Sequence, residues 1–192
     1  MHLVMFDIDG TLTETMKVDE ECFVRSFKDV FGFVDIDADW SHYPHTTDSG
    51  IFCDVFTARI GRSPTAQEVS QFRQHFIQLL AAASLQAPFA PVAGADGLLS
   101  RLTLGGSYRV SLATGGWRDS ARLKMASAGM CFDDHPAASA DDACRSVGIP
   151  FIGIGTGNRA TRLFAEGAVC VFPDFSDADI FLRSVYEITN AA

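Results

Sequence analysis

Two aspartates at the end of an apolar run are the residues of this chain best suited to chemistry. Asp7 and Asp9 follow the apolar residues 3–6 and precede Gly10 and Thr11. Side chains two residues apart on an extended strand point to the same side, so both carboxylates can converge on one site. Gly10 permits a sharp turn of the backbone beyond them. Paired carboxylates at the carboxyl end of a strand suit a hard cation and covalent phosphoryl chemistry, in which one Asp is the nucleophile.

Two simpler interpretations of this run are a hairpin turn and a fragment of a calcium-binding loop. An Asp-Gly pair by itself favours a hairpin turn. A calcium loop beginning at Asp7 requires Gly at its sixth position and Glu at its twelfth, and here these are Leu12 and Val18. The calcium loop is therefore excluded. The order of strand, two acids, glycine and hydroxyl disfavours a turn with no further role.

A second polar run follows another predicted strand. Thr114, Gly115 and Gly116 lie between a strand over 108–113 and a helix over 120–128. A hydroxyl and free backbone N–H groups at a helix N-terminus form an anion-binding site. Taken alone, this pattern is equally compatible with an ordinary connection from strand to helix.

Together the two runs resemble the first and second motifs of the haloacid dehalogenase (HAD) superfamily of phosphatases and phosphotransferases. The resemblance implies that Asp7 attacks phosphorus and that Asp9 is the general acid and base. It implies that Thr114, with Gly115 and Gly116, binds the transferring phosphoryl group. It also implies Mg2+, held by Asp7, Asp9 and a later acid. Asp9 disfavours a haloacid dehalogenase proper, which uses neither this acid nor Mg2+.

The third motif of the family is a basic residue that screens charge between the nucleophile and the phosphate. Lys124 is the only lysine after Thr114, and it lies in the next predicted helix, earlier than is usual in the family. We expect Lys124 to be this residue, and a solvated helix lysine is the open alternative. Arg118, Arg122 and Arg145 are weaker substitutes, because a guanidinium differs from an ammonium in geometry and hydration.

The fourth motif, one or two acids after a further buried strand, is not clear in this sequence. Acid pairs occur at 133–134 and at Asp141 and Asp142, but the proline and small residues of 136–140 make a poor buried strand. Six residues separate Asp142 from Ile149, whereas a parallel crossover needs about a dozen. We favour the absence of a segment that related chains have. The alternative is that Asp141 or Asp142 replaces the third metal ligand.

The elements that must position these residues fall into two groups. Residues 15–88 show helical periodicity in three stretches. The first ends at Gly32, the second runs from Asp48 to Gly61, and the third begins with a capping box of Thr65 and Glu68. From Pro91 onward, strands and helices alternate. Such alternation predicts a parallel sheet covered by helices.

We therefore predict an α/β fold, with a Rossmann-like parallel sheet flanked by helices and a small α-helical cap domain. The core comprises residues 1–14 and 89–192, and the cap comprises residues 15–88. A helical insertion after the first strand resembles the helical HAD cap, which closes over the site and selects the substrate. His42, His45 and Asp48 are candidates for the face of the cap that meets the site.

Composition narrows the partners and the compartment. The formal net charge of −9 disfavours a nucleic-acid or anionic-membrane surface. No apolar run approaches the roughly 20 residues that span a bilayer, and no signal-peptide pattern precedes the first strand. The five cysteines are odd in number and scattered, which favours free thiols in a reducing cytoplasm.

The expected function is a cytoplasmic Mg2+-dependent phosphatase that hydrolyses a small phosphorylated metabolite through an aspartyl-phosphate intermediate. Two alternatives are a phosphotransferase, such as a sugar phosphomutase, and a catalytically silent HAD-like binding protein. A receiver-type signalling domain is a further alternative. The first-strand motif and the large helical insertion disfavour it.

Overall fold

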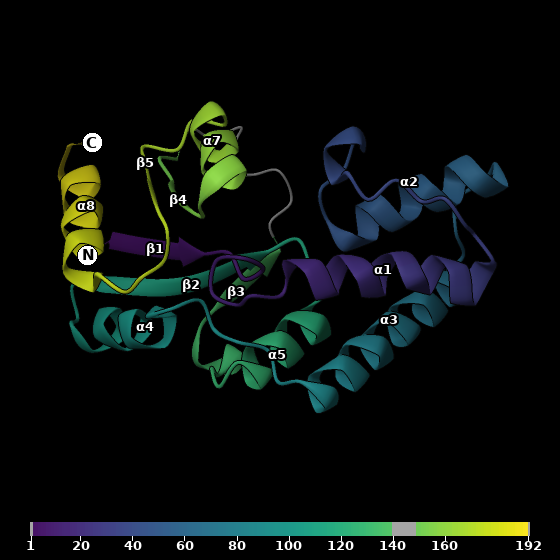
Figure 1. The fold of residues 1–192 in the computed structure, drawn as a ribbon, viewed down its shortest axis with the longest axis horizontal. Helices are drawn as coiled ribbons and strands as arrows, with labels where there is room; N and C mark the ends of the chain where they lie inside the picture. The colour runs from purple at the N-terminus through teal and green to yellow at the C-terminus, as the bar shows by residue number, and fades with distance from the viewer. Residues whose placement is uncertain (1, 140–148, 192) are drawn as a thin grey trace.

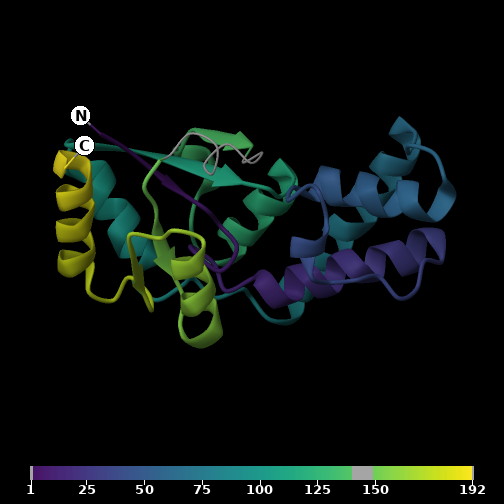
Figure 2. The same ribbon diagram turned by 90° about the horizontal axis from the view of Figure 1, so that it is seen from above.

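The computed structural model describes residues 2–139 and 149–191, which form two lobes (Figures 1 and 2). Both views place the strands and the last helix in one lobe and three long helices in the other. The first strand begins, and the last helix ends, in the part of the strand lobe that lies farthest from the three helices. The predicted combination of a parallel sheet with a helical unit is confirmed.

The sheet that carries the first two motifs has three parallel strands in the order β1-β2-β3. They are β1 (His2–Phe6), β2 (Tyr108–Thr114) and β3 (Ala137–Ser139). Phe6 pairs with Leu112, and Leu112 pairs in turn with Ala137. Because the strands are parallel, β1 and β2 end at the same edge, and the loops that follow them lie next to each other.

A second parallel pair consists of β4 (Ile152–Ile154) and β5 (Cys170–Phe172). Within the described residues, no strand pairs with the other edge of β1, where Leu3 and Met5 are 59% and 38% exposed. The loss of a strand between β1 and β4 would leave two separate sheets, which is the arrangement found among the described residues. The missing segment nevertheless stays a prediction.

Among the described residues, the strand lobe also contains the helices α4 (Ala95–Leu104), α5 (Arg118–Ser127), α7 (Gly157–Ala165) and α8 (Ala178–Ala191). In Figure 1, α4 and α5 lie below the strands and α7 lies above them. A single apolar cluster joins both sheets to these helices, with Phe6, Leu112, Met125, Ile154 and Phe181 among its buried members. We call it the core cluster.

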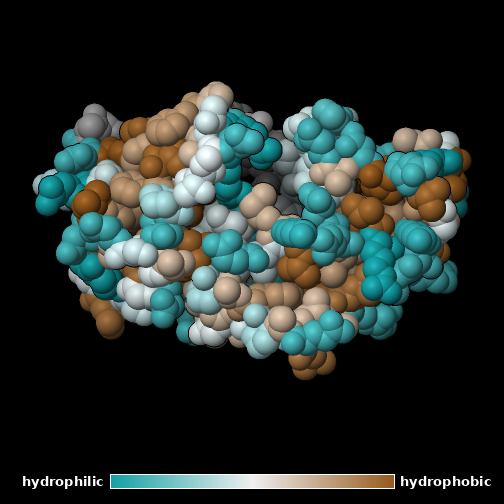
Figure 3. All heavy atoms as spheres, in the orientation of Figure 1, coloured by the Kyte–Doolittle hydropathy of each residue, from teal (hydrophilic) through white to brown (hydrophobic). Residues whose placement is uncertain are grey.

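Figure 3 shows apolar residues at the surface of the core where α7 and β5 lie. Phe164 in α7 and Val169 before β5 are both more than half exposed, at 55% and 56%.

The second lobe contains the three predicted helices: α1 (Met16–Phe31), α2 (Asp48–Ile60) and α3 (Ala66–Gln86). Gly32 and Gly61 end the first two helices in the left-handed conformation, with φ values of 70° and 79°. Thr65 and Glu68 form the predicted capping box of α3. A short 3-10 turn, η1 (Trp40–His42), lies between α1 and α2.

Phenylalanine dominates the interior of this lobe, which we call the cap cluster. Its buried aromatic members are Phe23, Phe27, Phe52, Phe56, Phe72, Phe76 and, at the boundary with the other lobe, Phe89. Trp117 and Leu123 of the other lobe also pack against this cluster. We propose that the division into a core of residues 1–14 and 89–192 and a cap of residues 15–88 describes the chain, and the two clusters support it.

The prediction that residues 136–140 make a poor strand was wrong for residues 137–139. Pro136 immediately precedes β3, and its carbonyl accepts bonds from the Leu112 N–H, at 2.8 Å, and the Ser111 hydroxyl, at 2.9 Å. The missing N–H of proline is no obstacle here, because Pro136 supplies only an acceptor to the ladder. Asp141 and Asp142 follow β3 in the sequence but lie outside the described residues.

Two further expectations concern membranes and thiols. No helix among the described residues is long and apolar enough to cross a membrane. Four of the cysteines, Cys22, Cys53, Cys131 and Cys170, are free thiols. Cys144 lies outside the described residues.

Candidate functional site

A tight turn after β1 sets the direction of the two aspartates. The Ile8 carbonyl accepts the N–H groups of Thr11, Leu12 and Thr13 at 2.9–3.2 Å. Gly10 has a φ of 70°, and a Cβ at this position would lie 2.4 Å from the sulfur of Met16. Glycine is therefore required both by the backbone conformation and by the close approach of α1.

Buried hydroxyls and an ammonium hold the carboxylate of Asp9 from two sides. The Thr15 hydroxyl donates to Asp9 Oδ1 at 2.5 Å and lies 2.6 Å from the Thr13 hydroxyl. Both threonines are fully buried. On the other side, Nζ of Lys124 lies 2.9 Å from Asp9 Oδ2. These contacts fix the orientation of the carboxylate.

Lys124 is a buried member of the site and not a solvated helix residue. Its side chain is 1% exposed and forms ion pairs with Asp9 and Asp19. Burial alone lowers the pKa of a lysine, but the nearby carboxylates of Asp9, Asp19 and Asp48 outweigh it and raise the pKa of Lys124. The ammonium therefore keeps its charge at neutral pH.

Asp7 retains solvent contact, and its negative charge is poorly compensated. Its Oδ2 accepts a bond from the Thr11 hydroxyl at 3.3 Å. Desolvation by the surrounding protein, followed by the charge of Asp9, raises the pKa of Asp7 to about 6. Arg159 is the nearby cation that opposes this shift, and it donates to the Gly10 carbonyl at 3.3 Å. A cation bound close to Asp7 would stabilise its ionised form.

The loop after β2 brings the second motif to the same place. Thr114 is buried, and its hydroxyl accepts the Gly116 N–H at 3.0 Å. Gly115 is in contact with the cap: its carbonyl accepts the Asp48 N–H at 2.9 Å, and a Cβ there would lie 2.9 Å from the Thr46 carbonyl oxygen. The glycine thus allows the backbones of the two lobes to meet.

The side chain of Asp48, the first residue of α2, forms a second hydrogen bond between the cap and this loop. Its Oδ2 accepts the Trp117 N–H at 2.9 Å, directly before the first turn of α5. A carboxylate is favourable there because a helix N-terminus carries partial positive charge. Burial, then the charge of Asp19, raises the pKa of Asp48 to about 7.

The indole of Trp117 forms the apolar part of the junction between the lobes. It contacts Phe23, Phe72 and Phe76 at centroid distances of 5.8–6.0 Å. Arg73 of α3 also forms an ion pair with Asp119 of α5. The cap is therefore held closed over the ends of β1 and β2.

Between the lobes lies a cavity of about 190 Å3. The core side of its wall contains Asp7, Asp9, Thr114, Gly115 and Gly116, and the cap side contains Asp19, Phe23, Trp40, Thr46, Asp48 and Ile51. Lys124 reaches the wall through its pairs with Asp9 and Asp19. All the site residues expected from the sequence thus lie in or beside one closed space.

The sequence left Asp19 out of the site, although its position carried a signal. Asp19 precedes the buried Cys22 and Phe23 by three and four residues, so it lies on the inward face of α1. Burial raises the pKa of Asp19 to about 6, with Lys124 opposing and Asp9 adding to the shift. An acid on the apolar face of a helix marks a buried partner or a ligand.

Other candidate residues lie elsewhere. Arg118 and Arg122 form ion pairs with Asp133, and Arg145 lies outside the described residues. His42 contacts Asp37 and Asp39, and His45 contacts Asp54, so neither histidine is part of the cavity wall.

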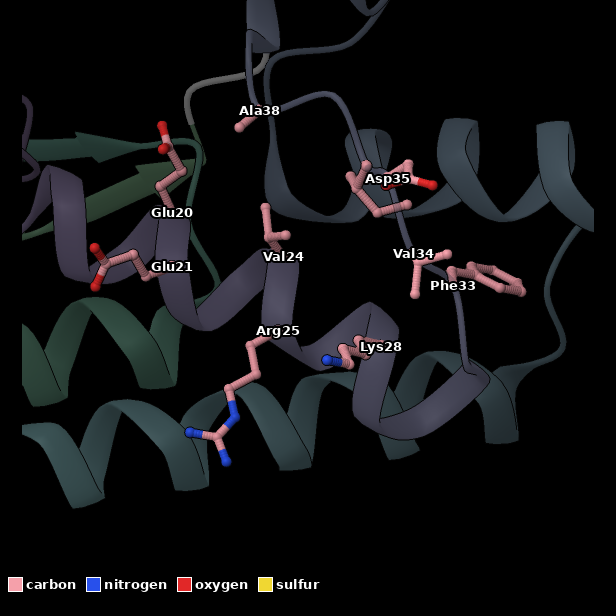
Figure 4. A pocket seen from close by; sticks show the side chains of 10 residues that line it. Glu20, Glu21, Val24, Arg25, Lys28, Phe33, Val34, Asp35 and Ala38 are labelled. Carbon is pink, nitrogen blue, oxygen red and sulfur yellow. The ribbon is translucent and has the colours of Figure 1, made fainter.

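A larger hollow of about 640 Å3 lies on the outside of the cap (Figure 4). It is formed by α1 and the segment over residues 33–38, and the charged side chains of Glu21, Arg25 and Lys28 lie along α1. It contains none of the motif residues and is not the candidate site.

No group of three or more histidine, cysteine or acidic side chains that could hold a metal occurs in the described residues. Of the acids that the sequence suggests as metal ligands, Asp7 and Asp9 are among the described residues. The other two, Asp141 and Asp142, lie outside them.

Comparison with known proteins gives matches at the level of structure only. No family model matches the chain, and no curated protein matches its sequence. A hydrolase from Pseudomonas syringae has a TM-score of 0.69 at 17% identity, covering 96% of this chain and 98% of the other. A mutant of CbbY from Rhodobacter sphaeroides, in complex with xylulose 1,5-bisphosphate, has a TM-score of 0.65 at 15% identity, with 92% and 96% covered.

A conserved haloacid dehalogenase-like protein from Agrobacterium tumefaciens has a TM-score of 0.58 at 14% identity, with 97% of this chain and all of the other covered. The similarity extends over nearly the whole length of each protein. At these identities it concerns the fold. The chain therefore has the haloacid dehalogenase fold, with a helical cap over the ends of the strands that carry its two motifs.

Proposed function

We propose that the chain is a Mg2+-dependent phosphatase that hydrolyses a small phosphorylated metabolite through an aspartyl-phosphate intermediate. One observation carries the proposal. Asp7, Asp9 and Thr114, from the ends of two adjacent parallel strands, share a closed cavity with an ammonium, Lys124, on Asp9. A nucleophile, a proton-transfer group and positive charge are the parts that phosphoryl transfer requires.

In the first step an oxygen of Asp7 attacks phosphorus, and the bond between phosphorus and the leaving oxygen breaks. The carboxylic acid of Asp9 gives its proton to that oxygen, so the product leaves as an alcohol. In the second step Asp9 takes a proton from a water that attacks phosphorus. The P–O bond to Asp7 breaks, which releases phosphate and restores both carboxyl groups.

Two further residues assist without forming bonds to phosphorus. The Thr114 hydroxyl and the Gly115 N–H stand where they can donate to the equatorial phosphoryl oxygens. Lys124 orients Asp9 and offsets the negative charge around it.

Asp7 and Asp9 are the residues that would hold Mg2+. The raised pKa of Asp7 supports a cation there, because it reflects desolvation by the surrounding protein and the nearby charge of Asp9, with too little positive charge to offset them. Mg2+ commonly takes one or two carboxylates, further oxygens and waters, which fits the carboxylate of Asp7, the backbone carbonyl of Asp9 and an oxygen of the phosphate. When bound, the ion would neutralise charge on the transferring group.

The cavity size favours water as the acceptor and so favours a phosphatase over a phosphotransferase. About 190 Å3 is below the roughly 300 Å3 at which typical ligand pockets begin. A phosphorylated fragment of a few carbons fills it and leaves little space for a second sugar. The pairing of Lys124 with Asp9 argues against a silent binding protein, because phosphate binding alone would not require it.

The phosphorylated nature of the substrate has support from a structural neighbour, since the CbbY mutant was solved with a sugar bisphosphate. The charge of −9 disfavours nucleic acid and anionic membranes as partners. Cytoplasmic localisation rests on the free thiols at four of the five cysteines.

The test is hydrolysis of p-nitrophenyl phosphate with and without Mg2+, on protein whose intact mass agrees with the 192-residue sequence. We expect Mg2+-dependent turnover that Asp7→Asn abolishes while the circular dichroism spectrum stays unchanged. Asp179→Asn, which changes an acid that is 80% exposed on α8, is the matched control and keeps full activity. Turnover by Asp7→Asn equal to that of the wild type would end the proposal.

A further inference from the structure

The cap side of the cavity is acidic and aromatic, a combination that suits a cation. Asp19 and Asp48 contribute carboxylates, and Phe23 and Trp40 contribute aromatic rings. The two rings pack edge to face with centroids 5.6 Å apart, so they form one surface. Carboxylates and aromatic faces are the two groups by which proteins recognise ammonium ions.

Asp48 has a carboxylate oxygen that can accept a further hydrogen bond. Its Oδ2 accepts the Trp117 N–H at 2.9 Å, and this bond fixes the side chain in place. No hydrogen bond to Oδ1 is formed by the residues that the structure describes. Asp19 differs, because the ammonium of Lys124 pairs with its carboxylate and offsets its charge. Asp48 is thus a fixed acceptor on the cap side that has no ion pair with the described residues.

The balance of charge points the same way. Four carboxylates, of Asp7, Asp9, Asp19 and Asp48, surround the cavity. Among the described residues, the cations beside them are Lys124, which pairs with Asp9 and Asp19, and Arg159, which lies near Asp7. A phosphate dianion adds two negative charges, and a Mg2+ ion offsets two. The complex remains negative unless the substrate also brings a positive charge. Burial makes this imbalance costly, as the raised pKa of Asp48 shows.

We propose that the substrate is a phosphate monoester of a small amino alcohol, with its ammonium group bound between Asp48 and Trp40. The proposal rests on the proposed function, since it places the phosphate at Asp7 and Thr114. The leaving oxygen then lies next to Asp9, and the carbon chain crosses from the core side to the cap side. A cavity of about 190 Å3 suits a chain of roughly two or three carbons.

The same geometry excludes other phosphorylated compounds. A second phosphate or a carboxylate at the cap end would meet Asp48 and Asp19, and like charges that close are repelled. A neutral hydroxyl would satisfy Asp48 with one hydrogen bond but would not offset the charge. The terminal group of the substrate therefore decides its affinity.

Three phosphonates of equal chain length isolate the terminal group: 2-aminoethylphosphonate, 2-hydroxyethylphosphonate and phosphonoacetate. Their C–P bond resists the proposed hydrolysis, so calorimetry with Mg2+ reports binding alone. We expect the amine to bind at least about tenfold more tightly than the alcohol, and the carboxylate to bind most weakly. The three corresponding phosphate esters should follow the same order in kcat/KM.

Asp48→Asn should reduce the preference for amine over alcohol to within about twofold, because the amide keeps the bond to Trp117 and loses the charge. Asp54→Asn is the matched control: Asp54 lies on the same helix, pairs with His45 and is not in the cavity wall, so its preference stays that of the wild type. The preference is a ratio measured on one folded protein, so a small loss of stability does not affect it.

Equal affinity for amine and alcohol, or tighter binding of the carboxylate, would overturn the inference. So would the absence of binding by all three phosphonates. Hydrolysis of p-nitrophenyl phosphate separates this failure from failure of the proposed function. Turnover without amine preference refutes the substrate class alone, whereas amine preference without turnover refutes the phosphatase alone.

Discussion

The ammonium of Lys124 lies 2.9 Å from Oδ2 of Asp9, in a side chain that is 1% exposed. One residue follows β1 and the other lies in α5, so the pair joins the two motif-bearing segments of the core. Lys124 also pairs with Asp19 of the cap. A single positive charge therefore supports both the orientation of Asp9, the proposed general acid, and the attachment of the cap.

Lys124→Met should strongly reduce activity and destabilise the fold. The substitution keeps an aliphatic chain of similar length but leaves two carboxylates without their cation. Removing one partner of a buried ion pair costs about 3 kcal/mol or more, and the loss of electrostatic support should lower kcat by about 100-fold. Urea unfolding and steady-state kinetics measure the two effects.

Lys17→Met is the control, because Lys17 is on the first turn of α1 with its side chain 89% exposed. Its free energy of unfolding should change by less than about 0.5 kcal/mol. If Lys124→Met were as stable and as active as Lys17→Met, the buried pair would have neither of the roles assigned to it.

The two glycines after Thr114 should tolerate alanine unequally. A Cβ at Gly115 meets the Thr46 carbonyl oxygen at 2.9 Å, and this oxygen belongs to the backbone of the cap. A Cβ at Gly116 has its nearest contacts at 3.3–3.5 Å, all with side chains that can move. Gly115→Ala should therefore cost about 1–3 kcal/mol and weaken cap docking, whereas Gly116→Ala should cost less.

Thermal unfolding and kcat/KM compare the two variants directly. An effect of Gly116→Ala on stability that equals or exceeds that of Gly115→Ala would mean that the cap does not approach the loop as closely as the structure shows.

Trp117→Ala should loosen the cap. The indole supplies three ring contacts to the cap cluster from the core side of the junction. Truncation of a half-buried tryptophan costs about 2–3 kcal/mol, and a loosened cap exposes the connections at its ends to protease. We expect faster proteolysis around residues 87–91 and a higher KM. Leu104→Ala, at a residue 86% exposed, should behave as the wild type in both assays.

Local signals in the sequence were sufficient for most of the elements. Gly32 and Gly61 end helices because each adopts a left-handed conformation that other residues resist, and this preference is readable without tertiary structure. Asp7 and Asp9 were recognisable because two acids, a glycine and a hydroxyl follow an apolar run, although both acids lie in the turn after β1 and not in the strand itself. β3 was missed, since three residues after a proline carry too little pattern to compete with their composition.

The cap side of the cavity was harder to foresee, because it depends on how the lobes meet. Asp48 opens a helix, where an acid is ordinarily explained by the helix dipole. Its contact with Trp117 joins residues far apart in the sequence. The helical pattern around Lys124 likewise fits a buried lysine and a solvated one equally well. Its burial follows from tertiary structure, which places Lys124 of α5 against Asp9 and against Asp19 of α1.

Asp48 should make the fold less stable as the pH rises. The pKa of this carboxyl is about 7 in the folded chain, against an ordinary value of 3.8. Below pH 4 the group is protonated in both states and costs nothing. Between pH 4 and pH 7 the unfolded chain releases the proton while the folded chain retains it, so the free energy of unfolding falls. Above pH 7 this group adds no further change.

Asp48→Asn removes this dependence while keeping an oxygen that can accept the Trp117 N–H. The wild type should lose on the order of 2 kcal/mol more than the variant between pH 5 and pH 8, since one pKa unit corresponds to about 1.4 kcal/mol. Urea unfolding at the two pH values measures it, and Asp54→Asn should follow the wild type. Because His42 also has a raised pKa and is unchanged in all three proteins, the difference between wild type and variant isolates Asp48. Parallel curves for all three would show that this carboxyl is ionised at neutral pH without cost, and the acidic wall of the cavity would then need no cation to balance it.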